Sequence, residues 1–191
     1  MKKAGVIGII TAMILGALGG CGKKAQTADN AGEAKSGFAA METVDLEQKE
    51  VNADIFKEND LTMINTWATW CGPCVGELPE LEEVNKELQE EGKKVAVKGM
   101  VIESEGVIKP GLSDDERKKV DEIIEKSGVT YQQLLVSEDL ANTVLSSQAV
   151  FPTTYFVDKD GNLVGDPVTG SQDKAGWKKI IDEKLEELKS E

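Results

Sequence analysis

Two cysteines separated by two residues are the feature of this sequence most able to do chemistry. Cys71 and Cys74 lie in the stretch WATWCGPCVGELP, residues 67–79. Thiols at this spacing can form a redox-active disulfide, supply half of a metal site, or make a structural cross-link. If the pair is redox-active, the direction of electron flow is a further question.

The two residues between the cysteines predict where the sulfurs lie. Gly72 allows a tight turn, and Pro73 has its backbone preset for the first turn of a helix. Cys71 is therefore expected at or just before a helix N-terminus, with Cys74 one turn inside. Free N–H groups and the helix dipole there favour the thiolate, which is the nucleophile in disulfide exchange. We predict that Cys71 attacks first and that Cys74 resolves the mixed disulfide.

A metal site, a haem site and a purely structural cross-link fit the sequence less well. Structural zinc takes four ligands, whereas the chain has three cysteines and no histidine. Covalent haem attachment requires a histidine where Val75 stands. A disulfide closing so short a loop removes little entropy from the unfolded chain. The pair is therefore expected to be redox-active, with no metal and no cofactor beyond its own disulfide.

The composition is that of an acidic globular protein. The 191 residues are 40% hydrophobic and 30% charged, which suits one domain with a sizeable core. Lys and Arg total 22 against 35 Asp and Glu, a net charge of −13. Such a chain is repelled by nucleic acid, which we do not expect as a partner. Without histidine, the usual general base near neutral pH is missing.

The N-terminus predicts export and a lipid anchor. Two lysines precede an apolar run over residues 4–18, which is the pattern of a secretory signal. The stretch LGGC, residues 18–21, resembles a bacterial lipobox, in which the cysteine is diacylated and becomes the mature N-terminus. A plain signal peptide with a stray cysteine, or an uncleaved anchor, is the alternative.

Three segments follow from this. Residues 1–20 are predicted as a lipoprotein signal peptide. Residues 21–37 comprise the lipidated Cys21 and a flexible tether with almost no large apolar side chains. The tether has a mean reach of about 20–25 Å, which keeps the domain near the membrane. Residues 38–191 form the folded domain.

Strands and helices alternate along that domain. A strand is predicted at 61–68, apolar on both faces, and others near 41–46, 95–102, 131–136 and 153–158. Asp160-Gly161 predicts a hairpin followed by a return strand. Helices are predicted at 78–88, at 114–126 behind a capping box of Ser113 and Glu116, at 139–148 and at 173–189. The order indicates a three-layer α/β domain with a mixed sheet.

The cysteine motif and its context resemble those of thioredoxins. Residues 70–74, WCGPC, are the thioredoxin active-site motif between a strand and a helix, and Pro79 stands where that family has a helix-kinking proline. Residues 151–153, FPT, stand where the family has a cis-proline loop facing the cysteines. The resemblance implies a thioredoxin-like three-layer α/β/α fold with a central mixed β-sheet. It also implies substrate-binding residues: Trp70, Gly72, Pro73, Phe151, Pro152 and Thr153.

More closely, residues 38–191 resemble the membrane-anchored thioredoxins of the TlpA/ResA group in the redoxin family. The shared marks are NTWATWCGPC, Glu77, VFPTTYFVDKDGNLV and VTG at 168–170. The group carries a glutamate at the position of Glu77 that influences the acidity of the cysteines, so Glu77 is a candidate catalytic residue. The alternative is an ordinary exposed helical acid. Asn65 replaces a buried aspartate that assists proton transfer in cytoplasmic thioredoxins.

The resemblance implies a thiol-disulfide oxidoreductase outside the cytoplasmic membrane, lipid-anchored to a bacterial cell. Family members take electrons from a membrane thiol donor and reduce client proteins such as apocytochrome c or methionine sulfoxide reductase. The motif CGPC resembles the reducing end of the fold's range. Trp67 is expected in the core and Trp70 beside the site, and residues 103–111 are expected to border the active-site groove.

Two other functions fit the sequence less well. A thiol peroxidase of the redoxin class requires the pattern P-x-x-x-T-x-x-C, and Ile64 and Ala68 occupy its proline and threonine positions. A non-catalytic lipoprotein binding module would not require the Gly-Pro spacer between the cysteines.

Overall fold

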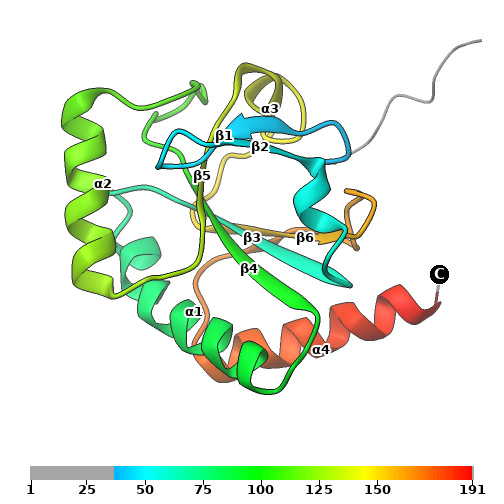
Figure 1. Cartoon of the computed structure of the whole chain (residues 1–191). Helices are drawn as coiled ribbons and strands as arrows, with labels where there is room; N and C mark the ends of the chain where they lie inside the picture. The colour runs from blue at the N-terminus through cyan, green and yellow to red at the C-terminus, as the bar shows by residue number, and fades with distance from the viewer. Residues whose placement is uncertain (1–36, 191) are drawn as a thin grey trace, which may run out of the picture. The chain divides into compact units, whose positions relative to one another are not determined.

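A computed structural model describes residues 37–190 of the chain. The predicted signal peptide, Cys21 and all but the last residue of the tether lie outside the described residues. Within them, a central mixed sheet has the strand order β5-β4-β3-β6-β7 (Figure 1). Its strands are β3 (Leu61–Trp67), β4 (Val95–Val101), β5 (Gln133–Leu135), β6 (Thr153–Asp158) and β7 (Val168–Thr169).

The sheet is parallel on one side of β3 and antiparallel on the other. β3, β4 and β5 run parallel, whereas β6 is antiparallel to β3 and β7 is antiparallel to β6. A separate hairpin of β1 (Glu42–Val44) and β2 (Glu50–Asn52) lies beside β5, where Leu46 N–H donates to the Gln133 carbonyl at 3.0 Å. The mixed sheet predicted from the order of elements is confirmed.

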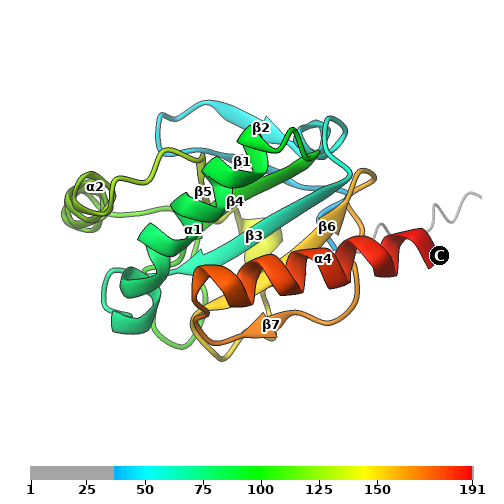
Figure 2. The ribbon, with the colours of Figure 1, turned by 90° about the horizontal axis from the view of Figure 1, so that it is seen from below.

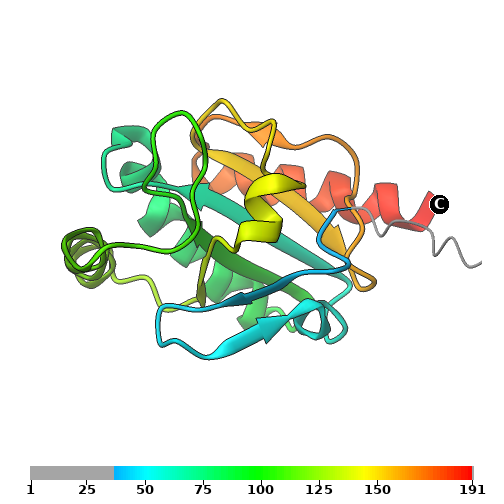
Figure 3. The same cartoon turned by 90° about the horizontal axis from the view of Figure 1, so that it is seen from above.

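Helices cover both faces of the sheet. On one face α1 (Gly72–Glu90) and α4 (Lys174–Ser190) pack against each other, with α2 (Asp114–Ser127) beside α1 (Figure 2). The opposite face carries the short α3 (Glu138–Asn142), a 3₁₀ turn η1 (Ala53–Phe56) and the β1–β2 hairpin (Figure 3). The three predicted layers are present. The layer on the face opposite α1 and α4 is built largely from short elements.

Alternating side chains along the strands divide the core in two. On β3, Met63 packs toward α1 and α4, whereas Ile64 packs toward the hairpin and α3. On β6, Phe156 and Tyr155 divide in the same way. Every residue of β3 is buried because both of its faces are covered. Its apolar side chains therefore point to both faces, and the polar residues Thr62, Asn65 and Thr66 are buried among them.

The helix predicted at 139–148 ends earlier than expected. α3 stops at Asn142, and Thr143 leaves helical geometry with φ −116° and ψ −104°. The Thr143 hydroxyl donates to the Asp139 carbonyl at 2.7 Å, and the Ser146 hydroxyl donates to the Thr143 carbonyl at 2.6 Å. Such side-chain hydrogen bonds compete with helix continuation. The turn lets Gln148 donate to the Thr66 hydroxyl at 2.8 Å.

The return strand after Asp160-Gly161 is shorter than predicted. Leu163 makes an isolated bridge to Val157, and regular pairing resumes only at β7. Gly165 (φ +62°) and the following Asp-Pro interrupt the strand, because proline cannot donate to a β-ladder. The hairpin exists, but its second arm is broken.

The capping box predicted at the start of α2 is present. The Ser113 hydroxyl accepts from Glu116 N–H at 3.4 Å, and the Glu116 carboxylate accepts from Ser113 N–H at 2.7 Å. We expect Ser113→Ala to lower the free energy of unfolding by about 1 kcal/mol, because N-terminal N–H groups of the helix lose their acceptor. Urea unfolding measures this change. Lys118→Ala, on the exposed middle of the same helix, should change it by less than about 0.5 kcal/mol.

Candidate active site

Cys71 and Cys74 form a disulfide at the N-terminus of α1. Cys71 is the N-cap residue, and the N–H of Cys74 lies 3.3 Å from its sulfur. Cys74 is fully buried, whereas 6% of the Cys71 surface is exposed. The more accessible residue of the pair is thus the one predicted to be the nucleophile.

A short turn carries the chain from the sheet to this helix. After Trp67, Cys71 N–H donates to the Ala68 carbonyl at 3.2 Å, and the helix begins at once with Val75 N–H donating to the Cys71 carbonyl at 3.0 Å. Pro73 occupies the first turn of α1, as predicted. The turn leaves Trp67 in the core and Trp70 44% exposed, which confirms the expectation for both tryptophans.

An aromatic pair lies beside the cysteine motif. The Phe151–Pro152 peptide bond is cis, as the resemblance implied. The ring of Phe151 meets that of Trp70 edge-on, with centroids 5.2 Å apart and an interplanar angle of 68°. The loops that precede α1 and β6 therefore meet beside the Cys71 motif, although 81 residues separate the two rings in sequence.

The other residues predicted to bind substrate divide between surface and interior. Gly72 and Pro73 are exposed. Thr153 is buried, and its N–H donates to the Thr66 hydroxyl at 3.2 Å while its carbonyl accepts from that hydroxyl at 2.7 Å. The Pro152 carbonyl accepts from Gly170 N–H at 2.9 Å. These backbone groups of Pro152 and Thr153 are therefore hydrogen-bonded within the domain. Contact of Pro152 and Thr153 with substrate stays a prediction.

Glu77 is a buried carboxylate, not an exposed helical acid. It is 3% exposed and lies three residues after Cys74, on the same side of α1. Its Oε1 accepts from Asn65 Nδ2 at 2.9 Å, and its Oε2 accepts from Gln172 N–H at 3.1 Å. Burial raises the pKa of Glu77 to about 7, although the hydrogen bonds from Asn65 and Gln172 act in the opposite direction. Such a carboxyl can take up or release a proton near neutral pH.

Asn65 has a role that the sequence did not reveal. Its Nδ2 donates to both Glu77 and the Thr154 hydroxyl, the latter at 3.0 Å, so it holds the carboxylate in place. Gln172 and Thr154 were not predicted as part of this site either. The contacts join β3, α1, β6 and the loop before α4, so no local pattern could have indicated them.

The segment 103–111 borders the site at its first residue, whereas its last residue, Gly111, lines a separate groove. Its first residue, Glu103, contacts Thr69 and Trp70, which directly precede the cysteine motif. Sequence reasoning did not identify Glu103. Its position directly after the predicted strand at 95–102 was the only available signal.

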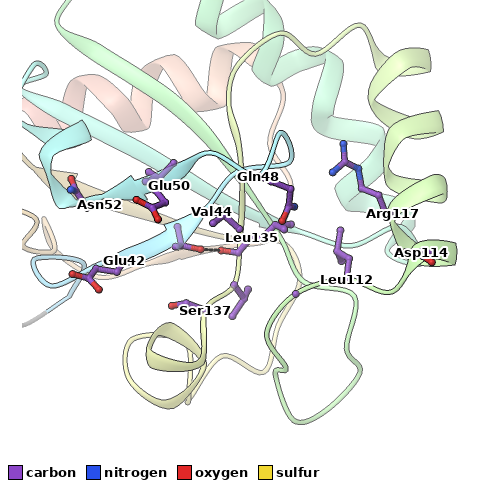
Figure 4. A pocket seen from close by; sticks show the side chains of 14 residues that line it. Glu42, Val44, Gln48, Glu50, Asn52, Leu112, Asp114, Arg117, Leu135 and Ser137 are labelled. Carbon is purple, nitrogen blue, oxygen red and sulfur yellow. Dashed lines mark hydrogen bonds between the residues drawn. The ribbon is translucent and has the colours of Figure 1, made fainter.

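A separate groove of about 790 Å³ lies between the β1–β2 hairpin, β5 and the start of α2 (Figure 4). At its wall, the Thr43 hydroxyl donates a hydrogen bond to the Leu135 carbonyl at 2.5 Å. The guanidinium of Arg117, which also lines the groove, forms an ion pair with Asp121. None of the residues predicted for the disulfide site lines this groove. Its lining is Glu42, Thr43, Val44, Gln48, Glu50, Val51, Asn52, Gly111, Leu112, Asp114, Arg117, Leu135, Val136 and Ser137.

Within residues 37–190, no three Cys, Asp or Glu side chains are grouped in a way that could hold a metal ion. None of the helices in this range is both long enough and apolar enough to cross a membrane.

The fold and the site together define a thioredoxin-like domain with a C-x-x-C disulfide at a helix N-terminus. Residues 22–181 match the family described as Redoxin, and the chain belongs to this family. A thiol:disulfide interchange protein of the thioredoxin family from Chlorobium tepidum has a similar structure. Its TM-score is 0.61 at 20% identity, with 80% of this chain and 99% of that chain covered. This likeness establishes the fold.

Curated relatives include the thiol-disulfide oxidoreductases ResA of two bacteria. The protein of Bacillus cereus is 28% identical over 134 residues, which cover 68% of this chain and 66% of the relative. That of Oceanobacillus iheyensis is 26% identical over 121 residues, which cover 60% of this chain and 55% of the relative. The chain thus matches between about half and two thirds of the length of these relatives.

Proposed function

We propose that this protein is an extracytoplasmic thiol-disulfide oxidoreductase that reduces disulfides in client proteins. The observation that carries the proposal is the Cys71–Cys74 disulfide at the start of α1, with its more accessible residue at the N-cap. The names of the ResA relatives and the redoxin family support the same reaction.

In the proposed reaction, the reduced protein carries two thiols. The Cys71 thiolate attacks a client disulfide, forming a mixed disulfide and releasing one client thiolate, which takes up a proton. Cys74 then loses its proton and attacks the Cys71 sulfur, so that the second client thiol leaves and the Cys71–Cys74 disulfide forms. Two electrons pass to the client, and the number of thiols is unchanged.

Glu77 is the group proposed to manage the proton of Cys74. The sulfur of Cys74 is buried, so its proton has no direct exit to water. A carboxyl with a pKa of about 7, on the same side of α1, can accept this proton during the second step and return it when the disulfide is reduced again. Asn65 and Gln172 hold that carboxyl in place.

Insulin reduction tests the activity. The full chain in mild detergent, pre-reduced and freed of reductant, should yield about one free insulin thiol pair per molecule, and should turn over repeatedly when a thiol donor is supplied. An equal concentration of free cysteine is the control for uncatalysed exchange. A rate no faster than that control would contradict the proposal.

The direction of electron flow has its own test. A reduction potential near the approximately −270 mV of reducing thioredoxins supports net reduction of clients, whereas one near the approximately −120 mV of strong oxidants reverses the proposed direction. Equilibration with glutathione buffers and thiol alkylation measures this potential.

The location and partners are proposed from the sequence. The segment around Cys21 supports export and diacylation, a membrane thiol donor would return electrons to the disulfide, and the clients are proteins such as apocytochrome c or methionine sulfoxide reductase. Mass spectrometry of the mature N-terminus tests the anchor. A diacylglyceryl thioether on Cys21 supports it, and an N-terminus elsewhere contradicts it.

A further inference from the structure

Glu103 connects the end of β4 to the turn that carries the cysteine motif. Its carboxylate accepts from Thr69 N–H at 2.6 Å through Oε1 and from the Thr69 hydroxyl at 2.7 Å through Oε2. Its main-chain carbonyl accepts from Trp70 Nε1 at 3.1 Å. One residue therefore makes three hydrogen bonds to the two residues directly before Cys71.

These contacts join the two chain segments just beyond the point where the hydrogen-bond ladder between β3 and β4 ends. Ile102 N–H donates to the Trp67 carbonyl at 2.9 Å, one step beyond the last regular pair of β3 and β4. After that point the chain turns toward α1, and Thr69 N–H no longer faces a strand. The Glu103 carboxylate supplies the missing acceptor, and charge-assisted bonds of this kind are stronger than neutral ones.

The main-chain contact of Glu103 fixes an exposed side chain. Trp70 is 44% exposed, and a tryptophan at such a position would ordinarily sample several rotamers. Here its indole nitrogen donates a hydrogen bond to the Glu103 carbonyl, and its ring contacts the ring of Phe151 edge-on. Exposed Val150, the neighbour of Phe151, extends the apolar surface.

We propose that Glu103 is a positioning residue for client recognition. By holding the Thr69–Trp70 turn, it keeps Trp70 against Phe151 as a preformed apolar surface, which receives an apolar side chain flanking the client's cysteine. A fixed side chain loses less entropy when a client binds, so pre-organisation increases affinity. The inference rests on the proposed reductase function and adds to it a basis for choosing clients.

The test compares two disulfide substrates. One is a peptide with leucine or phenylalanine beside each cysteine of its disulfide, and the other is hydroxyethyl disulfide, which has no such side chain. Glu103→Ala should lower kcat/KM for the peptide about 2- to 10-fold, mostly through KM, and leave hydroxyethyl disulfide nearly unchanged. Glu103→Gln, which keeps an acceptor oxygen for Thr69 N–H, should restore most of the peptide activity.

A matched control and a double variant make the test specific. Glu105→Ala removes an exposed acid from the same segment and should leave both rates unchanged. Trp70→Ala should produce the same peptide-selective loss, and adding Glu103→Ala to it should cause little further loss, because the two residues act through one surface. Glu103→Gln, the smaller change at the same position, keeps the role of Glu103 testable if Glu103→Ala fails to fold, because a loss on both substrates in Glu103→Gln would equally overturn it.

The outcomes separate this inference from the proposed function. Equal losses on both substrates in Glu103→Ala, full additivity with Trp70→Ala, or failure of Glu103→Gln to recover activity would each overturn the positioning role. A wild-type protein that reduces neither substrate would instead overturn the reductase function itself.

Discussion

Cys71→Ser is expected to lower the rate of insulin reduction by at least roughly 10³-fold, to the uncatalysed background. Serine removes the nucleophile of the first step, and the remaining thiol among residues 37–190, that of Cys74, is fully buried. Cys74 is therefore not expected to attack a client disulfide and acts instead on the Cys71 sulfur of the mixed disulfide. Losses of this size are typical when the nucleophile of a covalent mechanism is removed.

Cys74→Ser provides the matched control for this prediction. It keeps the attacking sulfur and removes the resolving one, so it should become trapped in a mixed disulfide with the client. Non-reducing electrophoresis should show the covalent complex for Cys74→Ser and none for Cys71→Ser. The reverse pattern would exchange the two roles.

The stability of the oxidised protein is expected to fall as the pH rises from about 4.5 to about 7. Burial holds the pKa of Glu77 at about 7, above its ordinary value of 4.5. In this window the folded state keeps a proton that the unfolded chain has lost, so raising the pH favours unfolding. This difference in pKa between the folded and unfolded states stabilises the folded protein by up to about 3 kcal/mol at low pH, and the stabilisation is lost above about pH 7.

Three other carboxyls have pKa values shifted in the opposite direction. The pKa values of Asp45, Glu82 and Glu116 lie below their ordinary values, so the stability they contribute is present above about pH 5 and is lost toward acid. Desolvation opposes the lowering at Asp45 and Glu82, but hydrogen bonds from Gln132 and Thr130 outweigh it. The decline between pH 5 and 7.5 therefore reports mainly on Glu77.

Urea unfolding at pH 5 and pH 7.5 measures the effect, and Glu77→Gln is the control. The Oδ1 of Asn65 is buried and has no hydrogen-bond partner among the described residues, so its amide can turn to accept from the new side chain. We expect this variant to lose most of the pH dependence while remaining folded. An unchanged slope in Glu77→Gln would assign the effect to another group.

Much of this protein is determined by local sequence. Gly72 and Pro73 place a helix start directly after Cys71, because turn formation and the fixed backbone of proline depend on neighbouring residues alone. The capping box of α2 is local for the same reason. The apolar residues on both faces of β3 predict a covered central strand. The end of α3 is an exception, since its local pattern predicts a longer helix and the turn that replaces the rest of that helix brings Gln148 to Thr66, 82 residues away in sequence.

Only the tertiary structure decided how the cysteines are surrounded. In the sequence, Glu77 is only an acid within a predicted helix. In the folded chain it accepts hydrogen bonds from Asn65, 12 residues earlier, and from Gln172, 95 residues later, and burial raises its pKa. Glu103 acquires its role only because the parallel pairing of β3 and β4 brings it to Thr69, 34 residues earlier. The sequence by itself determines which groups can react, because reactivity belongs to the residue type. Their protonation and orientation depend on desolvation and on donors from distant segments, which exist only in the folded chain.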